Sequence, residues 1–80
     1  MLDIDNLIKI ADAYKAVTGL TEDTTVSYRV FGDTKKLAAI RGGADLTTRR
    51  YNAAMHWFRE NWPDGAPMPD LLISQHKDVA

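Results

Sequence analysis

Six basic side chains gather between Ser27 and Arg50, and this cluster is the feature of the sequence best suited to chemistry. The same stretch holds only two acidic residues, so its balance is +4, whereas residues 1–26 carry −3 and residues 51–80 carry −2. Clustered Lys and Arg neutralise phosphates. The total charge of −1 does not prevent this, because a Debye length of ~8–10 Å separates one face from another. The basic residues, which indicate a nucleic-acid partner, are Arg29, Lys35, Lys36, Arg41, Arg49 and Arg50.

Residue patterns typical of catalysis or metal binding are missing from the sequence. There is no cysteine, which excludes disulfides, thiolate zinc sites and thiol catalysis. His56 and His76 have no second histidine at the i, i+4 spacing of a metal site, and Ser27 and Ser74 have no base nearby in the sequence. The glycine pair at 42–43 lacks the Lys-Ser/Thr of a phosphate-binding loop. We therefore expect a protein that is not an enzyme and holds neither metal nor cofactor.

The composition, with 45% hydrophobic and 26% charged residues in 80, is that of one small globular domain. We expect this domain to span residues 1–63, followed by an extended C-terminal arm, residues 64–80, whose LLIS segment packs back on the domain or reaches a partner. No apolar run approaches ~18 residues, and the N-terminus carries acids where a signal peptide carries bases. A cytoplasmic protein without membrane contact is the resulting expectation.

The first half of the chain has the apolar spacing of two helices. One apolar stripe runs through Asp5–Thr18, which Gly19 is placed to end, and its members are Ile4, Leu7, Ile8, Ala11, Tyr14 and Val17. The second helix is expected over Thr24–Phe31, with Thr21 or Asp23 as its cap. Its alternating β-branched residues are also compatible with a strand, and we favour a helix because its neighbours are helical.

Two further helices follow the turn at Gly32. The third is expected over Thr34–Arg41, with Asp33 or Thr34 as its cap and with the glycine pair at 42–43 as its end. The fourth has Thr47 as its cap, and Leu46 and Tyr51 form a hydrophobic staple. It ends near Asn61–Trp62 before Pro63, and its inward stripe is predicted to be Tyr51, Ala54, Met55, Phe58 and Trp62.

Apolar and small residues in TVSYRVFGDTKKLAAIRGGADLTTRR have the spacing of two crossed helices. Val26 is followed by the small Ser27, and the next apolar positions are Val30, Leu37 and Ile40. This series resembles the helix–turn–helix of lambda-repressor-like (Cro-like) regulators, and the chain is similar to small prophage-type regulators of bacteria over about residues 24–63. The resemblance implies an all-α fold, a four-helix lambda-repressor-like domain with a C-terminal arm. It also implies a sequence-specific transcriptional regulator that binds double-stranded DNA as a homodimer.

The resemblance further assigns roles to single residues. Helix Thr34–Arg41 would enter the major groove, where a lysine donates to guanine acceptors and alanine methyls meet thymine methyls. The groove-facing residues would be Thr34, Lys35, Ala38 and Ala39. Phosphates would be held by Lys36, Arg41, Thr47, Thr48, Arg49 and Arg50, and by Arg29 from the helix before the turn. Gly32 stands one residue after the family's usual turn glycine, a position that Phe31 occupies here.

Other interpretations of the same residues stay open. The basic residues could form an ordinary solvated face, and Arg49 and Arg50 could pair with Asp45 or Glu60. The alternative function is a protein-interaction adaptor or anti-activator that binds a regulator or polymerase. It would use the C-terminal arm and Trp57, which is predicted to lie off the apolar stripe and to form a dimer surface.

Overall fold

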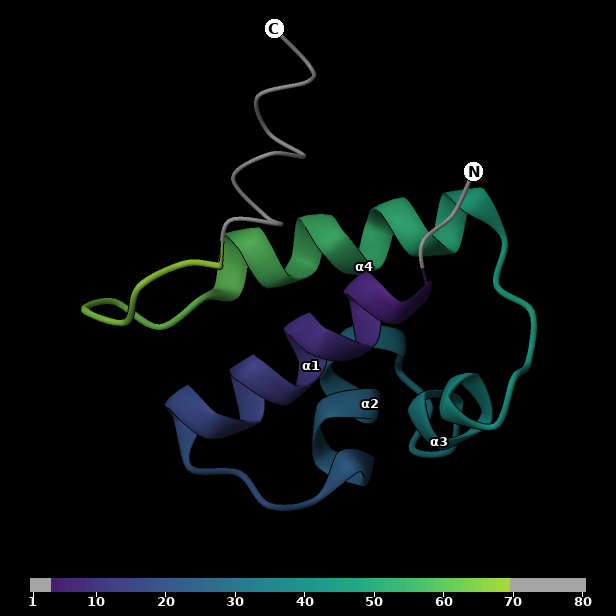
Figure 1. The fold of residues 1–80 in the computed structure, drawn as a ribbon, viewed down its shortest axis with the longest axis horizontal. Helices are drawn as coiled ribbons and strands as arrows, with labels where there is room; N and C mark the ends of the chain where they lie inside the picture. The colour runs from purple at the N-terminus through teal and green to yellow at the C-terminus, as the bar shows by residue number, and fades with distance from the viewer. Residues whose placement is uncertain (1–3, 70–80) are drawn as a thin grey trace, which may run out of the picture.

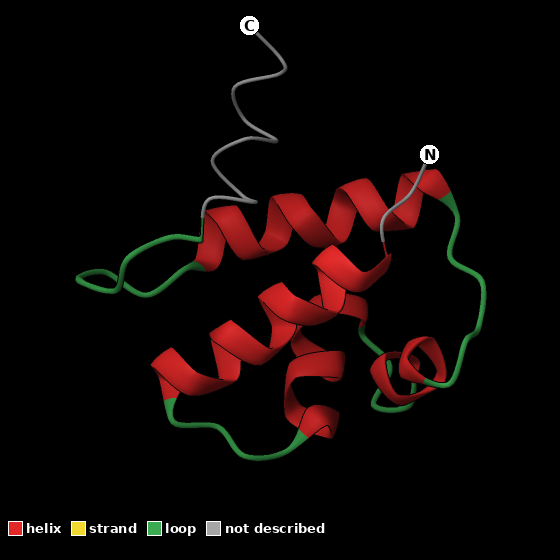
Figure 2. Cartoon of the chain, viewed as in Figure 1, coloured by secondary structure: helices red, strands yellow, loops and turns green. Residues whose placement is uncertain are grey.

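Four helices and no strand make up residues 4–69, the part of the chain that a computed structural model describes. They are α1 (Ile4–Thr18), α2 (Asp23–Phe31), α3 (Lys36–Arg41) and α4 (Thr48–Asn61). In Figure 1, α4 crosses the top of the domain, α1 runs diagonally below it, and α2 and α3 lie lower still. Figure 2 shows the same chain with only loops between the helices. The expected all-α architecture is therefore confirmed, including a helix where a strand was the alternative.

All four helices contribute side chains to one core. The most extensive helix–helix packing joins α2 to α3, and α4 packs against both α1 and α2. All five predicted inward positions of α4 are buried, and so are both apolar positions of α3. The buried apolar side chains are Leu7, Ile10, Ala11, Tyr14, Val26, Leu37, Ile40, Leu46, Tyr51, Ala54, Met55, Phe58 and Trp62.

The buried face of α1 differs from the predicted stripe, because Ile10 is fully buried whereas Ile4 and Ile8 are only partly buried. Leu7, Ala11 and Tyr14 are buried, but Val17 is 39% exposed. Val17 lies in the last turn of α1 and is not a member of the core cluster. The end of this helix thus contributes less to the core than its sequence pattern suggests.

Four aromatic rings pack together between α1 and α4. Tyr14 contacts Trp57, Phe58 and Trp62 in edge-on geometry, with centroids 5.5, 5.5 and 5.8 Å away. Such pairs are worth about 0.5–1.5 kcal/mol beyond burial. Trp57 is half-buried and packs against the core cluster. The prediction that Trp57 lies off the core is therefore wrong in part, because Tyr14 from α1 extends the core to reach it.

Helix ends follow the sequence signals in some places and not in others. Gly19 and Gly32 have φ of 75° and 72°, the left-handed conformation that glycine adopts without strain. Thr47 caps α4 as predicted, since its hydroxyl accepts the N–H of Arg50. The predicted cap of α2 is wrong: Glu22 holds that position without a side-chain hydrogen bond, and Asp23 lies inside the first turn.

The beginning of the expected arm packs back on the domain. Residues 63–69 contain no helix, as predicted. They are not extended away from the core, however, because the indole N–H of Trp62 donates to the Pro67 carbonyl at 3.2 Å and Met68 packs against the core cluster. The LLIS segment, residues 71–74, lies outside the described residues.

Candidate nucleic-acid interface

The turn between α2 and α3 is organised around one buried hydroxyl. The Ser27 side chain is fully buried. Its hydroxyl donates to the Asp33 carbonyl and accepts the backbone N–H of Leu37 at 2.9 Å. At the end of α2, the Gly32 N–H donates to the Tyr28 carbonyl at 2.8 Å. Ser27 therefore connects the last turn of one helix to the first turn of the next and fixes their relation.

The third helix begins two residues later than predicted. Thr34 and Lys35 form a turn, and α3 starts at Lys36. The predicted cap of α3 at Asp33 or Thr34 is wrong, because Lys35 holds that position without a side-chain hydrogen bond. The Asp33 carboxylate instead accepts the backbone N–H of Lys35 at 2.8 Å. That hydrogen bond holds the chain in a local Asx-type turn, which competes with a helix at these positions.

The surface of α3 and its preceding turn is divided into a buried and an exposed face. Leu37 and Ile40 are buried. Lys36 is half-buried, and the four residues that the resemblance placed in a groove are all exposed: Thr34, Lys35, Ala38 and Ala39. Lys35 makes no ion pair with any residue that the structure describes. This face is free to contact a ligand.

The first turn of α4 presents a second exposed basic segment. Thr47, Thr48, Arg49 and Arg50 are exposed, and the Thr47 hydroxyl accepts the Arg50 N–H at 3.2 Å. Within residues 4–69 neither arginine forms an ion pair. The alternative pairing with Asp45 or Glu60 is therefore not found. Free amides at a helix N-terminus favour anions, and adjacent arginines strengthen that preference.

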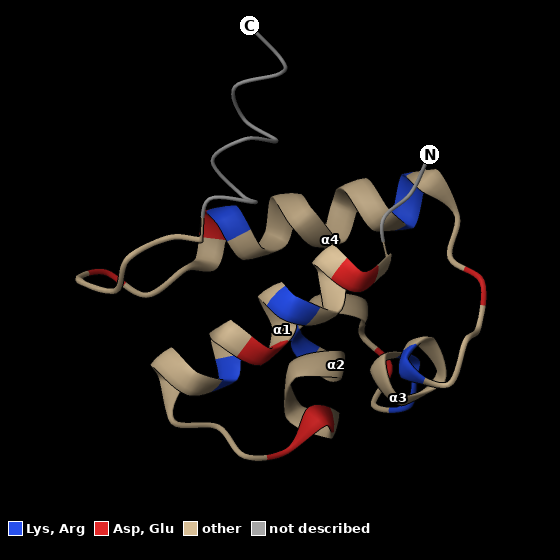
Figure 3. Cartoon of the chain, viewed as in Figure 1, with Lys and Arg blue, Asp and Glu red and all other residues tan. Residues whose placement is uncertain are grey.

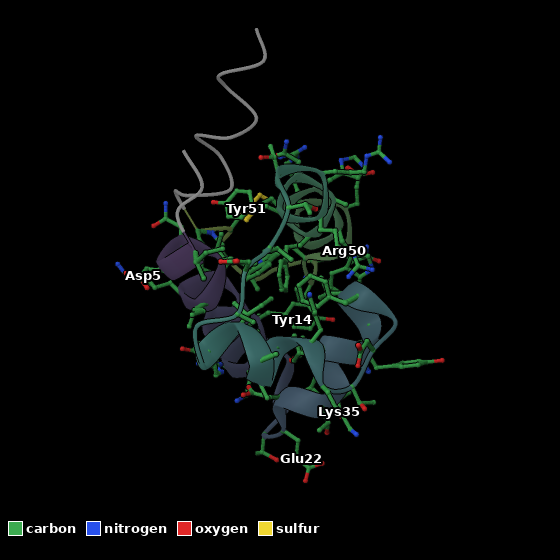
Figure 4. The ribbon with its side chains drawn as sticks, turned by 90° about the vertical axis from the view of Figure 1, so that its right-hand side faces the viewer. Asp5, Tyr14, Glu22, Lys35, Arg50 and Tyr51 are labelled. Carbon is green, nitrogen blue, oxygen red and sulfur yellow. The ribbon has the colours of Figure 1, made fainter. Side chains whose placement is uncertain are left out.

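Lys35 and Arg50 lie away from the acidic beginning of α1. Figure 4 shows Lys35 and Arg50 on the right-hand side of the molecule, whereas Asp5 of α1 lies on the left. Figure 3 shows basic segments in α3 and at the beginning of α4, an acidic segment at the start of α2, and both basic and acidic segments along α1. One half of the domain thus holds basic side chains from the turn before α3 and from the start of α4 that form no ion pair within residues 4–69.

Arg41 differs from the other basic residues because acidic side chains surround its guanidinium. Its Nε donates to Asp23 Oδ2 at 2.7 Å, and its Nη2 donates to Asp23 Oδ1 at 3.1 Å and to Asp12. The hydrogen bonds to Asp12 and Asp23 raise the pKa of Arg41 above its ordinary value. Much of the charge predicted to hold a phosphate is therefore compensated inside the protein. The sequence could not show this, because the partners lie 18 and 29 residues away.

Arg29 is also tied to another helix, but by a neutral group. Its Nη1 donates to the phenolic oxygen of Tyr14 at 3.1 Å. Arg29 remains exposed and makes no ion pair within the described part of the chain. Its charge thus remains uncompensated, and its predicted backbone contact stays a prediction.

An exposed aromatic residue and a hollow adjoin this surface, and sequence reasoning assigned neither. Tyr28 of α2 is 62% exposed. A hollow of about 170 Å³ lies between the end of α2 and α4, lined by Val30, Phe31, Arg50, Ala53 and Ala54. Tyr28 precedes Phe31 by three residues, a spacing that places both on one side of α2. The i, i+3 aromatic pair was the available sequence signal.

The described residues offer no site for metal chemistry. No group of three or more His, Asp or Glu side chains in residues 4–69 could hold a metal ion. His56 is exposed, and its Nδ1 lies 3.3 Å from Nη2 of Arg59. His76 lies outside the described residues, as does Ser74. None of the helices in the described part of the chain has the length and apolarity to cross a bilayer.

Comparisons with known proteins give no match: no protein-family model fits the chain, and neither a curated protein nor a solved structure is significantly similar to it.

Proposed function

We propose that this domain is a sequence-specific transcriptional regulator that reads the major groove of double-stranded DNA with α3. The observation that carries the proposal is the placement of Lys35 and Arg50, which are exposed, make no ion pairs in residues 4–69, and lie on one side of the molecule. Lys35 lies in the turn directly before α3 and Arg50 lies in the first turn of α4, so together they can contact a base edge and a neighbouring phosphate.

The dimensions of α3 suit this role. A six-residue helix is about 9 Å long, and the major groove of B-DNA is about 12 Å wide. In this arrangement Lys35 donates to guanine O6 or N7, and the methyls of Ala38 and Ala39 meet thymine methyls. Arg49, Arg50 and the hydroxyls of Thr47 and Thr48 bind phosphates beside the groove.

A homodimer completes the proposal. A single module of this size buries about 600–1,000 Å² on DNA, too little for tight specific binding. Two copies on symmetric half-sites double the contacts and impose a spacing of one helical turn. The dimer surface is not assigned to particular residues, because Trp57 already packs on Tyr14 and Phe58.

The alternative is a protein-interaction adaptor that uses the same face. Exposed Tyr28 and the hollow beside Arg50 favour it, because aromatic and arginine side chains are enriched in protein interfaces. Binding to random duplex as a function of salt separates the two, since only a phosphate-binding surface weakens steeply with ionic strength.

The test is a pair of substitutions measured on a cognate duplex selected from a random DNA pool and on random duplex. Arg50→Ala is expected to weaken both and to reduce the salt slope by about one unit, because it removes one phosphate contact. Lys35→Ala is expected to cost about 1–3 kcal/mol on the cognate site and little on random DNA.

Lys9→Ala is the matched control. Lys9 is exposed on α1 and makes no ion pair among the described residues. It lies four residues after Asp5, so the two share a helix face, and Figure 4 shows Asp5 on the left, away from Lys35 and Arg50. Its loss should leave binding nearly unchanged. If Lys35→Ala and Arg50→Ala behave like this control on every duplex, DNA binding by this face is refuted and the adaptor becomes the better account.

A further inference from the structure

Four charged side chains form a continuous chain of ion pairs across three helices. Lys15 Nζ of α1 lies 2.8 Å from Asp23 Oδ1 of α2. Asp23 accepts two hydrogen bonds from Arg41, in the turn that ends α3, and Arg41 also contacts Asp12 of α1. We call Lys15, Asp23, Arg41 and Asp12 the ionic clamp.

The ionic clamp connects α3 to α1, two helices whose backbones make few contacts with each other. Helix α3 packs chiefly against α2, and its contacts with α1 are much weaker. Asp12 and Arg41 join α1 to the far end of α3 directly. Arginine pairing with two oxygens of one carboxylate is directional as well as attractive, because the planar guanidinium fixes the approach. The clamp can therefore restrain the orientation of α3 and not only its distance.

We propose that Arg41 is a positioning residue that sets the orientation of α3, and that it is not one of the phosphate contacts. The two carboxylates occupy Nε and Nη2 of Arg41 and compensate its charge, so they disfavour a phosphate contact at this guanidinium. Its effect on DNA reading rests on the proposed function, but its effect on α3 does not.

The consequence for binding follows from pre-organisation. A DNA-contacting helix that is held in one orientation loses less conformational freedom when it enters the major groove. If the helix samples several orientations, the affinity falls in proportion to the fraction of molecules in the orientation that can bind. The benefit falls on base contacts, which need accurate placement. Phosphate contacts from long flexible side chains tolerate more movement.

The deciding experiment uses Asp12→Asn, because the two roles of Arg41 predict opposite signs. If Arg41 contacts a phosphate, loss of Asp12 should strengthen DNA binding, because a carboxylate that competes with the phosphate for Arg41 is removed. A positioning residue predicts about fivefold weaker binding to the cognate duplex, the scale of one exposed ion pair, with an unchanged salt slope. Tighter binding of Asp12→Asn to both cognate and random duplex would overturn the proposal.

Hydrogen exchange in the DNA-free protein tests the clamp independently of DNA. The N–H groups of Gly42, Gly43 and Ala44 donate to carbonyls of α3 and report on its far end. The N–H of Leu37 donates to Ser27 and reports on the near end. In Arg41→Gln the three far amides should exchange several-fold faster while Leu37 stays protected, whereas Arg41→Lys should give an intermediate rate. Equal rates in Arg41→Gln and wild type would refute the clamp even if DNA binding is confirmed.

These outcomes remain separable. Faster exchange at the far end without any DNA binding would support the clamp and reject the proposed function. Should Arg41→Gln fail to fold, Asp12→Asn serves both readouts, because Asp12 is the more exposed partner, with 55% of its side chain exposed against 27% for Asp23.

Discussion

The two ends of α3 are held by opposite kinds of interaction. At its beginning, the buried Ser27 hydroxyl exchanges neutral hydrogen bonds with the backbone of Asp33 and Leu37. At its end, the guanidinium of Arg41 lies at the surface between Asp12 and Asp23. Apart from the exposed hydrogen bond between the Asp33 carboxylate and the Lys35 N–H, the beginning of α3 is held by a buried neutral group. Its end is held by exposed charged groups.

This difference decides how strongly each end responds to its surroundings. A buried donor or acceptor that loses its partner costs about 1–3 kcal/mol, and salt has little access to it. An exposed ion pair is worth about 0–1 kcal/mol and is screened as ionic strength rises. The beginning of α3 is thus fixed whenever the protein is folded, whereas its end is restrained by an amount that solution conditions change.

The comparison also bears on how α3 would read DNA. Lys35 lies beside the rigid end, within the turn that Asp33 and Ser27 organise. Ala38 and Ala39 lie nearer the clamped end. Contacts at Lys35 should therefore be the least sensitive to the state of the clamp, and methyl contacts further along the helix the most sensitive.

Leu37→Ala should have the largest effect, because Leu37 anchors α3 between its two ends. Its side chain is fully buried in the core cluster, so truncation leaves a cavity and should destabilise the fold by about 2–4 kcal/mol. Chemical denaturation measures this loss, with exposed Ala38→Ser as the control. Wild-type unfolding of Leu37→Ala would show that the core does not depend on α3 in this register.

Ser27→Ala should have the next largest effect on stability. It would remove only the neutral hydrogen bonds at the beginning of α3. The Leu37 N–H and the Asp33 carbonyl would both lose their partner, at a cost of about 1–3 kcal/mol. The loss should be the same at low and high salt, because no charge is involved.

The control for Ser27→Ala is Thr34→Ala, which deletes an exposed hydroxyl from the same turn. Its stability should stay close to that of wild type. A loss in Ser27→Ala that shrinks strongly with salt would contradict the contrast between the two ends.

Much of the neutral end could be predicted from sequence, because its signals are local. The small residue after Val26, the glycine at the turn and the three-residue interval between Leu37 and Ile40 are all short-range patterns, and each places its residue correctly. The cap at Thr47 belongs to the same class, since it depends on residues three positions apart.

The charged end could not be predicted, for a physical reason. Arg41 meets partners on two other helices, and a run of basic residues gives no indication of which one will be compensated. Counting charges along the chain gave +4 to a segment in which Arg41 is balanced by acids from outside it. The same limit applies to Trp57, whose burial depends on Tyr14 from a helix that is distant in the sequence.

The smallest expected effect is that of acid, which should reduce the contribution of the ionic clamp to the unfolding free energy. The direction of this change follows from the pKa of Asp23. The hydrogen bond from Lys15, and then Arg41, lower the pKa of Asp23 below its ordinary value of 3.8, against partial burial, which raises it. A carboxylate with a depressed folded-state pKa stabilises the fold above its unfolded pKa and loses that contribution as pH falls through the folded value. The raised pKa of Arg41 keeps it charged throughout this range.

Wild type should therefore exceed Asp23→Asn in unfolding free energy by up to about 1 kcal/mol at neutral pH and low salt. The unfolding free energies of the two proteins should converge below pH 4, because Asp23 loses its charge beside Lys15 and Arg41. Asp12, the other acid on Arg41, is the same in both proteins and does not contribute to their difference. High salt at neutral pH should produce a similar convergence, because it screens the same pairs. Glu22→Gln is the matched control, since Glu22 is the exposed neighbour without an ion pair in residues 4–69, and its difference from wild type should be small at every pH. A gap between wild type and Asp23→Asn that persists unchanged into acid and into high salt would mean that Asp23 acts by packing, and the distinction between a neutral and a charged end of α3 would fail.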